Sequence, residues 1–159
     1  MVRGYCGIGV LNMKTEVNYG TLFRSALAFG ADFVFLIGRR FQKQCSDTSR
    51  SYRHIPVFEY LNCEDFLEHI PYDCMVVGVE ICERAIDLKI VSHPERAVYV
   101  LGPEDGSLPP SLIEKCHCVA KINTRICLNV AVAGSIILYD RFTKLGTNKE
   151  ELREQVEWL

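Results

Sequence analysis

The sequence of 159 residues lacks the patterns that mark several large classes of protein. No apolar run approaches the roughly 18 residues that a membrane-spanning helix needs. The N-terminal stretch is short, carries glycines and continues as a strand-like segment, so it does not resemble a signal peptide. The net charge is only −2, so the chain as a whole does not attract nucleic acid by charge alone. These absences, with 24% charged residues, predict one soluble globular domain.

The signatures of familiar nucleotide and metal sites are absent too. No glycine completes a GxGxxG fingerprint after Gly7 and Gly9, and there is no Walker phosphate loop. The eight cysteines form no C-x-x-C pair, and no histidine follows them at zinc-finger spacing. In Cys116-His117-Cys118, a strand would point the histidine away from the two thiols. We therefore expect no metal, and free thiols in the reducing environment of the cytoplasm.

The sequence does contain a regular alternation of short apolar runs and helix-like segments. Continuous apolar runs predict buried strands at residues 7–11, 33–37, 74–79, 97–101 and 118–122. Helical spacing and capping signals predict helices at residues 19–29, 64–70, 110–115 and 128–145. This alternation predicts an α/β fold with a parallel sheet covered on both faces. We expect one domain over residues 1–146, followed by an acid-rich tail over residues 147–159 that is either a terminal helix or a frayed end.

Polar residues and glycines gather where three of the predicted strands end. The three loops are NMKTEVNYG (12–20), GPEDG (102–106) and NTRICLN (123–129). Ligands of parallel α/β sheets bind outside the carboxyl ends of the strands, so these loops are candidates for a site. Taken singly, each signal has an ordinary explanation. GPEDG can be a polar turn, Asn129 a residue that starts a helix, and Arg24 a solvated helix arginine.

The combination of the three loops resembles a known family. NYGTLFRSA (18–26), LGPEDG (101–106) and CLNVAVAG (127–134), in this order, are similar to the three motifs of the SPOUT superfamily in its TrmH-like branch, the RNA ribose 2′-O-methyltransferases. The resemblance spans about residues 7–145. It implies a single-domain parallel-sheet α/β knot, in which the C-terminal half forms a trefoil knot, an exception to the rule against knots. It also implies bound S-adenosylmethionine and a homodimer that acts on tRNA or rRNA, with tRNA favoured for so small a chain.

The functional residues of the family carry over to individual positions of this sequence. The resemblance implies an active site that contains Asn18, Arg24, Glu104 and Asn129, with Arg24 contributed across the dimer interface. It implies cofactor contacts at Val79, Gly102, Ile122, Cys127 and Leu128. Because a guanidinium stays protonated at ordinary pH, we expect Arg24 to bind a phosphate and orient the 2′-hydroxyl rather than to act as the general base.

The chain departs from the family pattern at a few positions. The family usually has serine where this chain has Cys127, and a thiol is a weaker hydrogen-bond partner. It usually has proline where this chain has Asn123, and it often has proline near the start of the first motif, where residues 13–17 have none. These departures bear on the cofactor contacts and leave Arg24, Glu104 and Asn129 as the family has them.

A basic stretch between residues 39 and 54 contains a single acid, Asp47. We expect this loop to contact the phosphates of RNA. Its candidate RNA-binding residues are Arg39, Arg40, Lys43, Arg50 and Arg53. The alternative is an ordinary solvated loop.

Three hypotheses about function are carried forward. The first is an S-adenosylmethionine-dependent RNA ribose 2′-O-methyltransferase. The second, motivated by Asn123 and Cys127, is a catalytically inactive knotted protein that binds RNA. The third is an α/β protein for a small molecule whose match to the motifs arises by chance.

Overall fold

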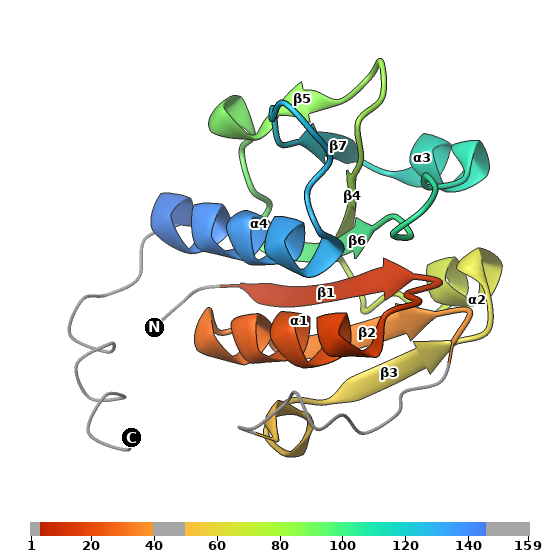
Figure 1. Ribbon diagram of the computed structural model, residues 1–159, viewed down its shortest axis with the longest axis vertical. Helices are drawn as coiled ribbons and strands as arrows, with labels where there is room; N and C mark the ends of the chain where they lie inside the picture. The colour runs from red at the N-terminus through yellow and green to blue at the C-terminus, as the bar shows by residue number, and fades with distance from the viewer. Residues whose placement is uncertain (1–3, 40–49, 146–159) are drawn as a thin grey trace.

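The computed structural model describes residues 4–39 and 50–145. Its core is a seven-stranded sheet in the order β3-β2-β1-β6-β4-β7-β5, in which all neighbouring strands are parallel (Figure 1). The strands are β1 (Tyr5–Leu11), β2 (Phe33–Ile37), β3 (Val57–Tyr60), β4 (Met75–Val79), β5 (Ile86–Asp87), β6 (Arg96–Leu101) and β7 (Cys118–Lys121). The α-helices of this part are α1 (Glu16–Ala28), α2 (Cys63–Glu68), α3 (Pro110–Lys115) and α4 (Val130–Leu145). Two short 3-10 helices are η1 (Ser51–Arg53) and η2 (Leu88–Ile90).

The predicted parallel α/β architecture is confirmed, with differences at the edges and at helix starts. The sequence did not predict β3 and β5, which form the two edges of the sheet and lack a continuous apolar run. Helix α1 begins at Glu16 rather than at Tyr19. Helix α4 begins two residues later than expected because Asn129 precedes it as its cap. The Asn129 side-chain oxygen accepts hydrogen bonds from the backbone amides of Ala131 and Val132 at 2.9 and 3.3 Å.

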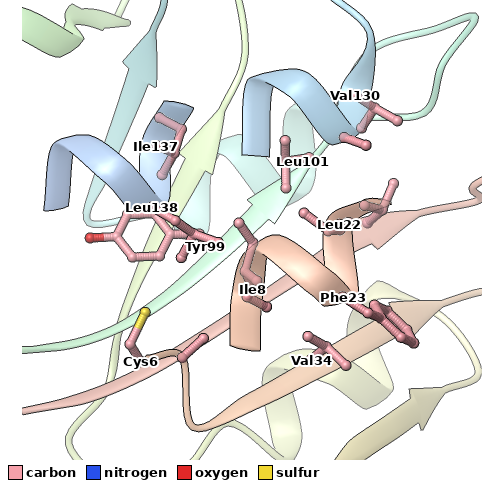
Figure 2. Packing of buried hydrophobic residues seen from close by; sticks show 14 of the residues in the cluster. Cys6, Ile8, Leu22, Phe23, Val34, Tyr99, Leu101, Val130, Ile137 and Leu138 are labelled. Atoms are coloured by element: carbon pink, nitrogen blue, oxygen red, sulfur yellow. The ribbon is translucent and has the colours of Figure 1, made fainter. Parts of the chain in front are cut away.

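Side chains along each strand alternate between two hydrophobic clusters, one on each face of the sheet. The cluster that packs under α1 and α4 includes Ile8, Leu22, Tyr99 and Leu101 (Figure 2). The cluster on the opposite face includes the buried side chains of α2 and α3, with Phe33, Phe35, Phe66, Val100 and Leu112. Both faces are therefore covered, as the continuous apolar strands predicted. Within the described part of the chain, no helix is long and apolar enough to cross a membrane.

A buried polar cluster fixes the C-terminal half of α4 near the amino end of β6. Arg141 is 5% exposed and donates to the carbonyl oxygens of Pro94 and Glu95, the latter at 2.7 Å. His93 bonds the Tyr99 hydroxyl through Nδ1 and Asp140 through Nε2, both at 2.7 Å. Because strands and helix run in opposite directions here, the first turn of α4 lies at the carboxyl ends of the strands.

Two glycines in β1 make room for two aromatic rings of β2. Gly7 and Gly9 lie opposite Phe33 and Phe35 in the parallel register. A Cβ atom at Gly9 would lie 2.2 Å from the Phe35 carbonyl oxygen and 2.3 Å from its ring. The space that the glycines leave is filled by the fully buried rings, so a larger side chain at position 7 or 9 would clash with them.

We therefore expect Gly9→Ala to overpack the core and lower the free energy of unfolding by about 1–3 kcal/mol. Urea unfolding followed by circular dichroism measures the effect, with Ser111→Ala on the exposed side of α3 as the control. Equal stability of Gly9→Ala and the wild-type protein would show that the sheet relaxes around the added methyl group.

Candidate active site

A pocket of about 440 Å³ lies at the carboxyl ends of β4, β6 and β7, beneath the start of α4. This volume falls in the range typical of small-molecule sites. The five residues expected to contact a cofactor all line it, namely Val79, Gly102, Ile122, Cys127 and Leu128. Two of the four expected active-site residues, Glu104 and Asn129, line it as well. The structure thus brings together residues from loops that are far apart in the sequence.

The Glu104 carboxylate joins the loop after β6 to the start of α1. It accepts hydrogen bonds from the Thr15 amide at 2.9 Å, from the Thr15 hydroxyl, and from the Asn18 side-chain amide at 2.9 Å. Thr15 stands at the N-cap position of α1, but its hydroxyl makes no cap bond to its own helix. Glu104 therefore supplies the negative group at this helix end, where the helix dipole favours it.

Asn18 and Asn129 extend this arrangement to α4. The Asn129 side-chain amide donates to the Asn18 side-chain oxygen at 3.0 Å, and Asn18 is itself buried. The other side-chain atom of Asn129 caps α4. One continuous set of hydrogen bonds therefore runs from Thr15 through Glu104 and Asn18 to the first turn of α4, along one edge of the pocket.

The surroundings of Glu104 keep it ionised. Burial raises the pKa of Glu104, but the hydrogen bonds from Thr15 and Asn18 together outweigh this effect, so the pKa lies below its ordinary value. Next to it, Asp105 forms an ion pair with Lys14, which ties the same two loops together at the surface.

A second carboxylate, Glu80, lines the pocket and was not predicted from the sequence. Its two oxygens accept hydrogen bonds from the backbone amides of Ile81 and Leu108, each at 2.8 Å. A Cβ atom at Gly102 would lie 3.0 Å from a Glu80 oxygen, so the absence of a side chain at Gly102 leaves room for the Glu80 carboxylate beside it. The sequence carried a usable signal, because Glu80 directly follows a buried strand in the same way as Gly102 follows β6.

Of the positions that depart from the family pattern, Asn123 forms a side-chain hydrogen bond and Cys127 lines the pocket. Asn123 donates to the Asp87 carboxylate at 2.6 Å, so a side-chain hydrogen bond holds the loop at that position. Cys127 lines the pocket and is an exposed free cysteine. Neither residue has a positive φ angle, so neither requires a strained backbone at its position.

Arg24 lies apart from the pocket of its own chain. It does not line the pocket, and its exposed side chain belongs to a stripe with Val17, Thr21 and Ala28 on the outer side of α1. Leu22 and Ala26 are fully buried on the other side of the helix. The structure therefore does not unite Arg24 with the other three predicted active-site residues within one chain.

The predicted RNA-binding residues fall in different places. Arg39 is exposed and follows β2, so it lies on the side of the carboxyl ends of the strands, as the pocket does. Arg50 and Arg53 are exposed at η1, which precedes β3 and therefore lies on the side of the amino ends of the strands. Arg40 and Lys43 lie outside the described residues, as does the acid-rich tail.

Among residues 4–39 and 50–145, no three metal-ligating side chains gather into a cluster. Burial raises the pKa of the Cys116 thiol to about 11, and Cys116 donates to the Leu112 carbonyl oxygen. The neighbouring His117 accepts a hydrogen bond from the Val76 amide through Nδ1. These contacts give Cys116 and His117 structural roles at the start of β7.

A profile of the SpoU rRNA Methylase family matches residues 7–139, which include all three motifs and the whole pocket. The chain belongs to this family. Its resemblance to TrmH-like methyltransferases is thereby confirmed, and the RNA methylase family accounts for the order of the motifs around the pocket. A comparison with curated proteins found no match.

Solved structures share the fold of this SpoU family member at low sequence identity. An rRNA methyltransferase from Sinorhizobium meliloti is 24% identical with a TM-score of 0.79, over 91% of this chain and 58% of that chain. A TrmH/SpoU tRNA modifying enzyme from A. aeolicus is 19% identical with a TM-score of 0.78, over 99% and 89%. A structure that concerns the 2-OH methylation of C/U34 on tRNA is 20% identical with a TM-score of 0.77, over 90% and 97%. The chain thus spans little more than half of the S. meliloti protein and nearly all of the last.

The hydrogen bonds of Glu104 predict a measurable contribution to stability. A glutamine cannot accept hydrogen bonds with both of its terminal atoms, so we expect Glu104→Gln to lower the free energy of unfolding at neutral pH by about 1 kcal/mol. The value is small because the carboxylate is exposed. Since the pKa in the folded state lies below the ordinary value of 4.5, the stabilisation is present above about pH 4.5 and is lost as the pH falls through the folded-state pKa.

Urea unfolding from neutral pH to about pH 3 tests this, with Glu114→Gln on the exposed side of α3 as the control for loss of a carboxylate. A difference between Glu104→Gln and wild type that stays constant down to about pH 3 would contradict the role given to the ionised carboxylate.

Proposed function

We propose that this SpoU family member transfers a methyl group from S-adenosylmethionine to a ribose 2′-hydroxyl of RNA, with tRNA rather than rRNA as the substrate. The observation that carries the proposal is the pocket at the ends of β4, β6 and β7, bordered by hydrogen-bonded Glu104, Asn18 and Asn129. The S. meliloti rRNA methyltransferase that shares the fold has been solved with AdoMet bound. The preference for tRNA is supported by the two tRNA-related structures, of which this chain spans 89% and 97%.

The pocket suits the proposed cofactor in shape and charge. Its walls include the apolar side chains of Val79, Ile122 and Leu128, and Gly102 lets a ligand approach the backbone closely. The carboxylates of Glu80 and Glu104 complement a cationic ligand. When bound, S-adenosylmethionine would supply an electrophilic methyl group on a sulfonium centre.

The residues of the chain would bind and orient the two reactants. Attack of an oxyanion on a sulfonium merges opposite charges, so a pocket with apolar walls that excludes water favours the reaction. Asn18 and Asn129, whose amide positions are fixed by their mutual bond and by Glu104, are placed to orient polar groups at the pocket edge. Arg24 would bind the phosphate next to the target ribose and align the hydroxyl, and the proton would leave to phosphate or water.

Arg24 reaches a pocket only if the protein is a homodimer, which we include in the proposal. The outer side of α1 carries Arg24 together with Val17, which is 58% exposed. Helix α4 packs against α1 through a 2.7 Å hydrogen bond between Ser25 and Ser135, and exposes Tyr139 at 56%. Exposed apolar side chains on the two packed helices are suited to burial against a second copy, and such a dimer would bring Arg24 of α1 to the pocket of that copy. The trefoil knot of the C-terminal half and a cytoplasmic location complete the proposal as predictions.

The first test is transfer of labelled methyl from S-adenosylmethionine to purified tRNA and, separately, to rRNA. We expect label in tRNA, and we expect Arg24→Ala to lower the rate by at least roughly 100-fold, as loss of a positioning contact does. Cofactor binding by calorimetry should be unchanged in the variant, because the proposed contact of Arg24 is with the RNA phosphate and not with the cofactor.

Two results would contradict the proposal. Cofactor binding without transfer to either RNA pool would point to another substrate. RNA binding without cofactor binding would support the inactive RNA-binding protein instead.

The intersubunit role of Arg24 predicts that two inactive variants restore each other. Gly102→Val places a branched side chain against Glu80 and closes the pocket, while leaving Arg24 intact. Co-expressed with Arg24→Ala, it should yield heterodimers with one complete site, and about a quarter of the wild-type activity after random pairing. No recovery would show that Arg24 serves the pocket of its own chain.

A further inference from the structure

The loop between β7 and α4 places two exposed side chains at the rim of the pocket. Thr124 and Cys127 line the pocket, whereas Arg125 and Ile126, which lie between them, do not. Both of these side chains are exposed, and Ile126 is 80% exposed. The loop thus turns one set of side chains into the pocket and presents the other at its mouth.

Arg125 makes no hydrogen bond or ion pair with any residue in the described ranges 4–39 and 50–145. Other arginines of these ranges are used within the fold. Arg84, Arg96 and Arg141 all donate to backbone carbonyl oxygens. On the other side of the pocket, Lys14 is neutralised by Asp105. Arg125 therefore leaves its five donors available at the rim.

The charges of the residues that line the pocket favour the binding of an anion outside the pocket rather than inside it. Inside are the carboxylates of Glu80 and Glu104 and a single cation, Lys121. A phosphate would be repelled from the interior and attracted to Arg125 at the mouth. A small molecule held in the pocket would not reach Arg125 directly, because that side chain does not line it.

Apolar side chains flank the same rim. Ile81 lines the pocket from the loop after β4 and is still 62% exposed. Ile126 adds an exposed apolar side chain directly after Arg125 in the loop. An apolar surface beside an arginine is the pairing that a nucleotide requires, because a base presents an uncharged face and its backbone an anionic phosphate.

We propose that Arg125 binds a backbone phosphate of the RNA substrate at the rim of the pocket, and that Ile126 packs against the adjoining nucleoside. This inference rests on the proposed function, because it specifies how the RNA is held there. Arg125 and Ile126 are positioning residues, and their effect should fall on RNA binding and not on cofactor binding.

The experiment compares wild type with Arg125→Gln, with Lys115→Gln as the control that removes one exposed positive charge from α3. Binding of purified tRNA is measured between about 50 and 200 mM salt, and S-adenosylmethionine binding is measured by calorimetry. Arg125→Gln should weaken tRNA binding roughly 5- to 20-fold at low salt and reduce the slope of log affinity against log salt by about 1. The KM for tRNA should rise while kcat stays close to wild type, and cofactor affinity should stay within about twofold.

Ile126→Ser tests the apolar half of the site. It should weaken tRNA binding without changing the salt slope, because no charge is removed. Arg125→Lys should retain the salt slope and recover part of the affinity, since a lysine keeps the charge but loses the fork of donors.

Each failure has its own signature. If Arg125→Gln behaves as Lys115→Gln does, while wild type binds and methylates tRNA, the inference is wrong and the proposed function stands. If Arg125→Gln loses cofactor affinity in parallel with RNA affinity, Arg125 serves the cofactor, and the inference is again wrong. If wild type neither binds nor methylates RNA, the proposed function is wrong, and the inference with it.

Discussion

The pocket depends on the hydrogen bonds that the Glu104 carboxylate accepts from Thr15 and Asn18. These bonds link the loop after β6 to the start of α1. Thr15 and Glu104 are 89 residues apart in the sequence. Asn18 passes the link on to Asn129, which caps α4. Each of the three motifs therefore supplies one member of a single network. The network thus ties the three motifs together along one edge of the pocket.

The network can form because the sheet brings the right strand ends together. All strands are parallel, so the loops that leave β1, β4, β6 and β7 emerge at one edge. Close packing then sets the heights of the helices above the sheet. A Cβ atom at Gly134 would lie 2.5 Å from a methyl group of Leu22, so glycine lets α4 settle directly against α1. Asn129 and Asn18 thereby come within hydrogen-bonding distance.

The distribution of charge separates two kinds of partner. Inside the pocket, Glu80 and Glu104 are held by backbone and side-chain donors, a setting that favours a cation. Outside it, Arg125 at the rim and Arg24 on α1 carry positive charge without partners in the described part of the chain, a setting that favours a polyanion. The near-neutral charge of the whole molecule conceals this arrangement. An enzyme that transfers a methyl group from a sulfonium cofactor to RNA needs a site for a cation and a site for a polyanion within a short distance of each other.

By itself, the sequence determined the central strands and the family. Strands that are buried on both faces read as continuous apolar runs, and the three motifs are recognisable from their residues and their order in the sequence. Through the resemblance to the family, it also indicated the five residues that line the pocket. Only the tertiary structure decided that β3 and β5 form the edges and that Thr15 and Glu80 belong to the site. The order of the strands in the sheet decides which strands form its edges. The direction in which a side chain points across the contact between neighbouring loops decides whether it belongs to the site. Such long-range pairings leave no local pattern in the sequence, because strand order is settled only when the sheet assembles and its faces are buried.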